Sequence, residues 1–351
     1  MRSFLAVTIA LFSGLLWADD VPPLEPVPPP GTTLEQWEKQ REDIIRRFEL
    51  ISGPFPRPEK PVPLEPEIVE EVTLDDGIIR RKISYHTDSP DVRRTAYLMI
   101  PPTKPGQKRP AMIVFHSTQP DGKLQAVGLA HKPSRHIGLH LAQRGYVTIA
   151  PDYPSFGEFQ HDFANDNYES GTMLGIYTGV RTLDLLAEQP EVDPNRMGAI
   201  GHSLGGHTSI FTALFEPRIK VIVSSCGFTR VHRYYEGDLT GWTSDRYFPR
   251  VASVYDKDPD KMPIDYPEMI AFLAPRPFFT NSPLHDSNFE VIGVRETMAA
   301  SQSAYDLYGV PEAIQAIYPD CEHDFPPEAR EAAYSFLDRY LKPDQLAPTE
   351  K

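Results

Sequence analysis

The sequence predicts an α/β protein in which helices cover both faces of a mostly parallel central sheet. Two kinds of segment support this prediction. Short, largely apolar runs at 111–115 and 146–150 are typical of strands that are buried on both faces of a sheet. Segments with helical periodicity, at 136–144 and 171–188, alternate with these runs along the chain.

The other expected elements continue the alternation. Two early strands, at 79–86 and 95–100, precede the buried strands and form a meander. Further strands are expected at 196–200, 221–225, 277–280 and 313–318, and further helices directly after residue 203 and at 327–340. Together these elements define one catalytic domain over residues 69–344. The stretch 227–267 fits no strand–helix alternation, and we interpret it as a lid or a pocket wall.

Two segments precede this domain. Residues 1–18 resemble a signal peptide, because Arg2 is followed by an apolar run that is too short for an ordinary membrane span. A retained membrane anchor is the alternative. We therefore expect a secreted or periplasmic protein without stable membrane insertion once the signal is cleaved.

Residues 19–68 form a proline-rich extension with one helix. Residues 19–33 are rich in proline and acidic residues, and we expect them to be a loose tether. A helical pattern starts at Thr33 and stops at Gly53, which proline follows, and we expect this helix to pack on the outside of the main domain. Residues 345–351 are a short tail.

Composition excludes some classes of partner. The 351 residues, 40% of them apolar, are enough to form one large core. The formal net charge of −14 argues against binding to nucleic acid, since a polyanion would be repelled. An acidic surface by itself names no partner.

Residues 201–205 match the pattern G-x-S-x-G, with Ser203 at its centre. A strand is expected before this segment and a helix after it, which is the setting of a nucleophilic serine in an α/β-hydrolase fold. The glycines permit the tight turn, because a side chain there would strike the neighbouring strand or helix. The start of the helix also directs positive dipole toward a developing anion.

The partners of such a serine follow it along the chain in the order acid, then histidine. Asp286 and His323 each come shortly after an expected strand, at the edge of the sheet where such folds carry active groups. We expect His323 to take the proton of Ser203 and Asp286 to hold the imidazole in its working tautomer. Asp320 and Glu290 are the alternatives for the acid.

An oxyanion hole needs two backbone N–H groups. We expect one from Leu204, the residue after the nucleophile, and one from Thr118, in the loop that follows the strand 111–115. Ser117 is the alternate for the second donor. This loop lacks the glycines that usually mark such a site.

Aromatic residues are frequent in the segment 227–267. Tyr234, Tyr235 and Trp242 are candidate substrate-binding residues, because aromatic faces suit both sugars and acyl groups. The alternative is that these side chains only pack the segment onto the domain.

No metal or cofactor site is expected. His131, His136 and His140 include an i, i+4 pair, but no carboxylate with zinc-site spacing accompanies them, so a surface helix face is favoured. Cys226 and Cys321 follow strands that should lie two apart in the sheet. Strands two apart are separated by roughly 10 Å, whereas a disulfide needs Cα atoms within roughly 7 Å, so we predict free thiols. A bridge that closes through an inward bend of the loop around Cys321 is the alternative.

Beyond these patterns, residues 191–207 resemble the matching segment of dienelactone-hydrolase-like and prolyl-oligopeptidase-like members of the α/β-hydrolase superfamily. Residues 273–277 are similar to a segment of secreted acetyl xylan esterases and glucuronoyl esterases. The resemblance implies cofactor-free hydrolysis of a carboxylic ester, on a plant or algal polysaccharide. It departs from dienelactone hydrolases, which use cysteine where this chain has Ser203. It also departs from glucuronoyl esterases, which have cysteine and arginine where His202 and Leu204 stand.

The sequence thus predicts a secreted serine esterase that forms an acyl-enzyme on Ser203 and acts on an ester of a small molecule or a polysaccharide. A peptidase or amidase is the first alternative, since the same residues serve acyl transfer from amides. The related peptidases carry a large propeller domain, for which this chain is too short. A non-catalytic binding protein is the second alternative, although binding alone does not require the nucleophile, acid and base together.

Overall fold

One nine-stranded sheet organises the protein, and its order is β1-β2-β3-β5-β4-β6-β7-β8-β9. The computed structural model describes residues 21–342 except 131 and 166, so the predicted signal peptide and tail lie outside the described residues. The strands are β1 (Glu67–Thr73), β2 (Ile79–His86), β3 (Arg93–Ile100), β4 (Arg109–Phe115), β5 (Val147–Pro151), β6 (Val192–His202), β7 (Ile219–Ser225), β8 (Phe278–Asn281) and β9 (Ile314–Ile317).

The sheet is mostly parallel, as predicted. Strands β1, β2, β3 and β5 pair antiparallel with one another, and every pair from β5 through β4 to β9 is parallel. Strands β4, β5, β7 and β8 are short and almost wholly buried, which agrees with their apolar sequences. Their carboxyl ends lie along one edge, where this fold places active groups.

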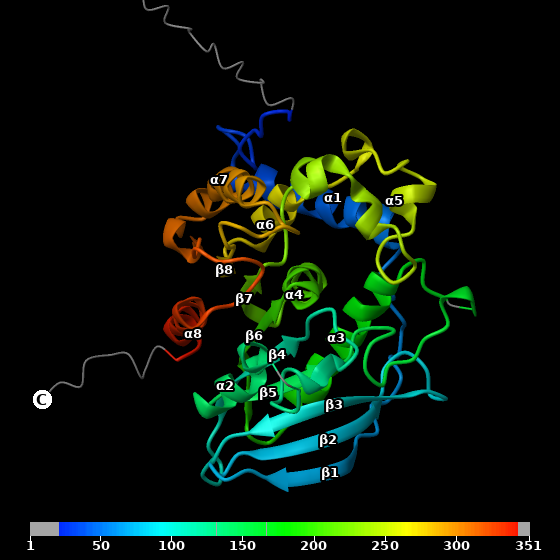
Figure 1. Ribbon diagram of the computed structural model, residues 1–351, viewed down its shortest axis with the longest axis vertical. Coiled ribbons are helices and arrows are strands. Elements are labelled where there is room, and N and C mark those ends of the chain that lie inside the picture. The colour runs from blue at the N-terminus through cyan, green and yellow to red at the C-terminus, as the bar shows by residue number, and fades with distance from the viewer. Residues whose placement is uncertain (1–20, 131, 166, 343–351) are drawn as a thin grey trace, which may run out of the picture.

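Helices cover both faces of the sheet (Figure 1). They are α1 (Leu34–Ser52), α2 (Ile137–Gln143), α3 (Gly171–Ala187), α4 (Leu204–Phe215), α5 (Arg250–Ser253), α6 (Tyr266–Leu273), α7 (Val291–Leu307) and α8 (Pro327–Leu341). Helices α2 and α8 pack on one face, and α3 and α4 pack on the other. The protein therefore has the α/β-hydrolase fold. Among the described residues, we find no helix that is both long and apolar enough to cross a membrane.

The segment 227–267 lies beside α4 and holds only short helical turns, α5 and the start of α6. Four elements were not expected from the sequence, namely β1, α5, α6 and α7. Strand β1 begins at Glu67, so the sheet starts two residues before the predicted domain boundary at 69. All seven residues of β1 are exposed, which explains why no buried periodicity marked it.

The first helix agrees with its predicted limits. Thr33 is its N-cap in a capping box with Gln36, and Gly53 ends it at a φ of 83°. Its apolar face, which includes Trp37 and Phe48, is buried in the main core. The helix therefore packs against the main domain, as expected.

The expectation of a loose tether is wrong for the described part of residues 19–33. The amide of Val27 donates to the carbonyl of Ala300 in α7 (2.8 Å), and the hydroxyl of Ser303 donates to the Pro28 carbonyl (2.7 Å). Pro28 is buried. A proline-rich segment loses little backbone entropy on docking, so a few contacts hold it against α7.

Candidate active site

Ser203 lies at the sharp turn between β6 and α4. Its backbone has a φ of 57° and a ψ of −119°, a sparsely populated conformation that costs energy for a residue with a side chain. A Cβ on Gly201 would lie 2.3 Å from the Gly205 backbone, and a Cβ on Gly205 would lie 2.1 Å from the Phe115 carbonyl oxygen. Only glycine fits at these two positions, as the motif predicted.

The predicted acid and base are hydrogen-bonded to each other. Nδ1 of His323 lies 3.0 and 2.9 Å from the two carboxylate oxygens of Asp286. The Asp286 side chain is 1% exposed, whereas that of His323 is 23% exposed. The amides of Asn288 and Phe289 donate to the same carboxylate (2.9 and 3.0 Å), so its orientation is fixed independently of the imidazole. His323 and Ser203 line the same cavity.

The alternative acid Asp320 pairs with a different histidine. Asp320 is largely exposed, and its carboxylate contacts the ring of His285 at 2.7 Å. Glu290 is the residue before α7. Asp286 therefore provides the carboxylate that contacts His323.

A buried histidine supports the loop after β4, which carries the predicted oxyanion donor Thr118. Nδ1 of the buried His116 lies 2.7 Å from the Ser117 carbonyl, and its Nε2 accepts a hydrogen bond from the Tyr153 amide (2.9 Å). An accepting Nε2 leaves the ring proton on Nδ1, so His116 is neutral and donates to Ser117. Burial also lowers the pKa of His116.

This contact fixes the peptide between Ser117 and Thr118. The peptide is trans, since the cis bonds among the described residues lie elsewhere, so the Thr118 N–H points away from His116. Within the described part of the chain, neither the N–H of Thr118 nor that of Leu204 donates to a protein acceptor. Both residues line one cavity with Ser203.

A buried ion pair anchors the next part of this loop. Lys123 and Asp152 are almost completely buried, and the ammonium group contacts the Asp152 carboxylate and that of Glu158 (2.9 Å to the latter). Asp152 also accepts from the amides of Lys123 (2.8 Å) and Glu158 (3.0 Å). The loop that carries Thr118 is therefore held to the segment after β5.

Two cavities flank Ser203. The larger, of about 590 Å³, is lined by the base His323 and by cationic side chains, Lys132 and Arg135. The smaller, of about 170 Å³, is lined mainly by aromatic side chains, and these include all three predicted substrate-binding residues, Tyr234, Tyr235 and Trp242. Three residues line both cavities, namely Ser203, Thr118 and Asn288.

Buried histidines surround the nucleophile. Burial and the nearby charge of Arg135 lower the pKa of His202 well below its usual value. Burial lowers the pKa of His207 to about 3, although the Gly227 carbonyl near its ring opposes the shift. These imidazoles are therefore neutral at pH 7.

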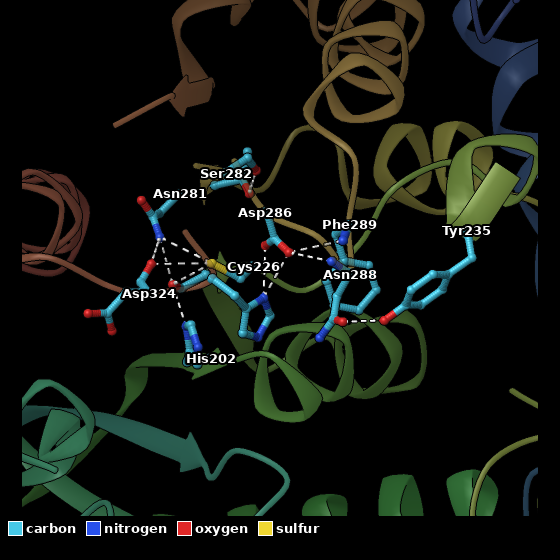
Figure 2. A network of polar contacts seen from close by, with 12 residues as sticks. His202, Cys226, Tyr235, Asn281, Ser282, Asp286, Asn288, Phe289 and Asp324 are labelled. Atoms are coloured by element: carbon cyan, nitrogen blue, oxygen red, sulfur yellow. Dashed lines mark hydrogen bonds and ion pairs between the residues drawn. The ribbon is translucent and has the colours of Figure 1, made fainter. Parts of the chain in front are cut away.

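Cys226 lies beside the acid (Figure 2). Its sulfur is 3.3 Å from the Asp324 carbonyl, and Asn281 Nδ2 donates to the same carbonyl at 2.9 Å. The residue next to the base is thus tied to the ends of β7 and β8. Burial raises the pKa of the Cys226 thiol well above its usual value, and the charge of Asp286 adds to this shift.

Both cysteines are free, as predicted, and β8 lies between the strands that precede them. His136 and His140 of the rejected metal set contact the Ala130 carbonyl and the Tyr334 hydroxyl, while His131 lies outside the described residues. Within the described chain, metal-ligating atoms of three side chains converge within 4.8 Å, in Cys226, Asp286 and His323. Two of these are the hydrogen-bonded acid and base.

Sequence reasoning missed two residues of this site. Asn288 lies two positions after Asp286. An aspartate side chain often accepts a hydrogen bond from the backbone N–H two residues further on, and this local pattern could have identified Asn288. The contact of His116 with its own neighbouring carbonyl had no sequence signal, because it depends on the rotamer of a buried ring.

Comparisons with known proteins find a matching family model and solved structures with a similar fold. The model of the prolyl oligopeptidase family matches residues 134–344. YtaP of Bacillus subtilis, which is named as a hydrolase, is 25% identical over 291 residues, 79% of this chain and 89% of its own. A glucuronoyl esterase from Solibacter usitatus superposes with a TM-score of 0.70 at 18% identity, over 88% of this chain and 94% of its own. An acetyl xylan esterase from Paenibacillus sp. R4 gives 0.57 at 16% identity, over 88% and 96%.

Proposed function

This chain belongs to the prolyl oligopeptidase family, and from that premise we propose that it is a secreted serine esterase that cleaves carboxylic esters of carbohydrates. One observation carries the proposal. The strained turn at Ser203 opens into the same cavity as His323, whose ring is hydrogen-bonded to the buried Asp286. A nucleophile, a base and an orienting acid in this arrangement serve acyl transfer to water.

In the first step Ser203 Oγ attacks the ester carbonyl carbon while Nε2 of His323 takes the hydroxyl proton. The carbonyl π electrons move to oxygen and give a tetrahedral oxyanion. The N–H groups of Leu204 and Thr118 are free to donate to that oxygen, and the N-terminus of α4 adds favourable dipole. Asp286 stabilises the imidazolium as it forms.

In the second step the oxyanion collapses, and the bond between the carbonyl carbon and the alkoxy oxygen breaks. His323 returns its proton to that oxygen, so the alcohol leaves neutral and the acyl group stays on Ser203. Water then attacks the acyl-enzyme with His323 again as base, which releases the acid and restores the serine hydroxyl. No cofactor is required for any of these steps.

Two observations support a carbohydrate substrate. Polar and charged side chains line most of the larger cavity beside the nucleophile, and such groups suit the hydroxyl groups of a sugar alcohol. Two structures that resemble this chain are named as a glucuronoyl esterase and an acetyl xylan esterase. The apolar run that predicts a signal peptide, at residues 1–18, supports secretion and agrees with an extracellular polysaccharide substrate.

A substrate panel tests this proposal. Purified protein is assayed with phenyl acetate, acetylated xylan, a glucuronate methyl ester and a peptide 4-nitroanilide, each with the Ser203→Ala variant as the blank. We expect hydrolysis of at least one carbohydrate ester, and loss of that hydrolysis in the variant. Turnover of the anilide alone would identify a peptidase and overturn the proposal.

A further inference from the structure

We propose that the side-chain amide of Asn288 binds a hydroxyl or ring oxygen of the leaving alcohol, and so selects esters of polyhydroxy alcohols over simple esters. The inference rests on the proposed esterase function and adds a specificity-determining residue to it. Three structural facts carry it, namely the orientation of the amide, its place between the two cavities and the place of the base.

The orientation of the Asn288 amide is fixed by its neighbours (Figure 2). The hydroxyl of Tyr235, from the segment 227–267, donates to Oδ1 of Asn288. The Asn288 backbone amide donates to the Asp286 carboxylate at 2.9 Å. With Oδ1 engaged by Tyr235, the Nδ2 group is left to donate into the site. A preoriented donor binds a ligand with little loss of side-chain entropy.

Asn288 stands where the two cavities meet. It lines both of them together with Ser203 and Thr118, the nucleophile and the predicted oxyanion donor. A group held by Asn288 is therefore close to the ester carbon that Ser203 attacks. The residue itself is half-buried, which leaves its amide accessible to a substrate.

The chemistry of the leaving group decides which part of the substrate Asn288 contacts. His323 must deliver its proton to the alkoxy oxygen, so the alcohol occupies the cavity that His323 lines. That cavity is the larger one, of about 590 Å³, and its other walls are polar. A bulky alcohol with several oxygens fits it, whereas the smaller, aromatic cavity is left for the acyl group.

The test compares two esters with the same acyl group, so that both pass through the same acyl-enzyme. Acetylated xylotriose carries hydroxyl and ring oxygens on its alcohol, and phenyl acetate carries none beyond the ester. The measured quantity is the ratio of kcat/KM for the saccharide ester to that for phenyl acetate. Removal of one hydrogen bond should lower this ratio by about tenfold.

Asn288→Ala and Asn288→Asp are the test variants, because the first removes the donor and the second replaces it with oxygen at constant size. We expect both to lower the ratio. Tyr235→Phe keeps the amide but frees its rotation, so it should lower the ratio by a smaller factor. Asn195→Asp, at the exposed far end of β6, is the matched control for added charge and should leave the ratio unchanged.

An unchanged ratio in the Asn288 variants would overturn the inference. An equal loss on both esters would also overturn it, since that pattern indicates an effect on the reacting groups themselves. The control for folding is the melting temperature, which should stay close to that of the wild type.

A binding measurement separates this inference from the proposed function. Calorimetric titration of acetylated xylotriose into Ser203→Ala should detect binding, and the Ser203→Ala/Asn288→Ala protein should bind about tenfold more weakly. Equal affinities, or no binding to Ser203→Ala, would contradict the role of Asn288. If the double variant binds more weakly than Ser203→Ala and the wild type hydrolyses no ester, the proposed function fails while the contact at Asn288 stands.

Discussion

The ring of His323 contacts both oxygens of the Asp286 carboxylate through one nitrogen, Nδ1. Two backbone amides already hold this carboxylate, so Asp286 fixes the ring and not the reverse. The hydrogen on Nδ1 leaves Nε2 free to take a proton from the nucleophile. This relationship is the basis of the first prediction.

Asp286→Asn should lower kcat by about 10³–10⁴, because an amide in place of the carboxylate favours the wrong imidazole tautomer. Esterase rates measured on purified variants check this. The matched control is Asp320→Asn, an exposed acid that contacts His285. If Asp320→Asn were the damaging change and Asp286→Asn harmless, the acid would be misassigned.

Ser203→Ala should abolish ester hydrolysis and leave the fold intact. It removes the nucleophilic oxygen without opening a core cavity, and a loss of about 10⁴ or more in kcat is expected. Circular dichroism and thermal unfolding report on the fold in the same samples. Retention of a tenth of the activity would show that another group is the nucleophile.

His116→Ala should slow the chemical step more than it weakens substrate binding. Without the ring, the peptide that carries the Thr118 N–H loses its support, and loss of one oxyanion donor costs about 10²–10³ in kcat. KM should change little, whereas affinity for a boronic acid that mimics the tetrahedral state should fall in parallel with kcat.

A structural effect alone would not produce this pattern. His116→Asn keeps a donor for the Ser117 carbonyl, so it should recover part of the lost kcat and of the boronate affinity. If His116→Ala lowered only the melting temperature, the second oxyanion donor would lie elsewhere.

The sequence predicted those parts of the site that depend on local pattern. A strand, a glycine turn and a helix specify the position of Ser203 because each requires particular residues at adjacent positions. Asp286 and His323 followed from strand ends that an apolar pattern marks. Leu204 followed from its place after the nucleophile.

Other features depend on contacts between distant segments. Tyr235 reaches Asn288 from a different part of the chain, and nothing in either local sequence indicates the pairing. The docking of Val27 on the Ala300 carbonyl is similar, since a proline-rich segment has the same composition whether it is docked or loose. Strand β1 carries no buried pattern because both of its faces are exposed.

Stability should fall as the pH drops below about 6.5, because buried neutral histidines become protonated when the chain unfolds. Burial lowers the pKa of His207 from 6.5 to about 3, so between these values the unfolded state binds more protons than the folded state. Its contribution is complete above pH 6.5 and is lost progressively toward pH 3. His116 and His202 act in the same direction.

His207→Phe tests the contribution of His207 to this pH dependence, because it removes one of the histidines that become protonated on unfolding. Its ring lies among Trp242 and Phe211, at centroid distances of 4.9 and 5.5 Å, which a phenyl ring can also contact. Urea unfolding at pH 7 and pH 5 should give a difference in unfolding free energy that is smaller in the variant by about 2 kcal/mol. An unaltered pH dependence would mean that His207 is not neutral in the folded state.

The two thiols should differ in reactivity. Cys226 is 1% exposed with a raised pKa, so a thiol reagent should modify it only when the protein unfolds. Cys321 is partly exposed, and its pKa is raised less, by partial burial and by neighbouring acids such as Asp324. We expect slow modification of Cys321 in the native protein and none of Cys226.

Counting thiols in denatured, unreduced protein completes this prediction. Strand β8 separates the strands that precede Cys226 and Cys321, which places those strands roughly 10 Å apart, whereas a disulfide requires Cα atoms within roughly 7 Å. Two free thiols are therefore expected even after secretion into an oxidising compartment. No free thiols at a monomeric mass would contradict the geometry, and Cys321→Ser, which should leave one thiol, is the control that assigns the native reactivity.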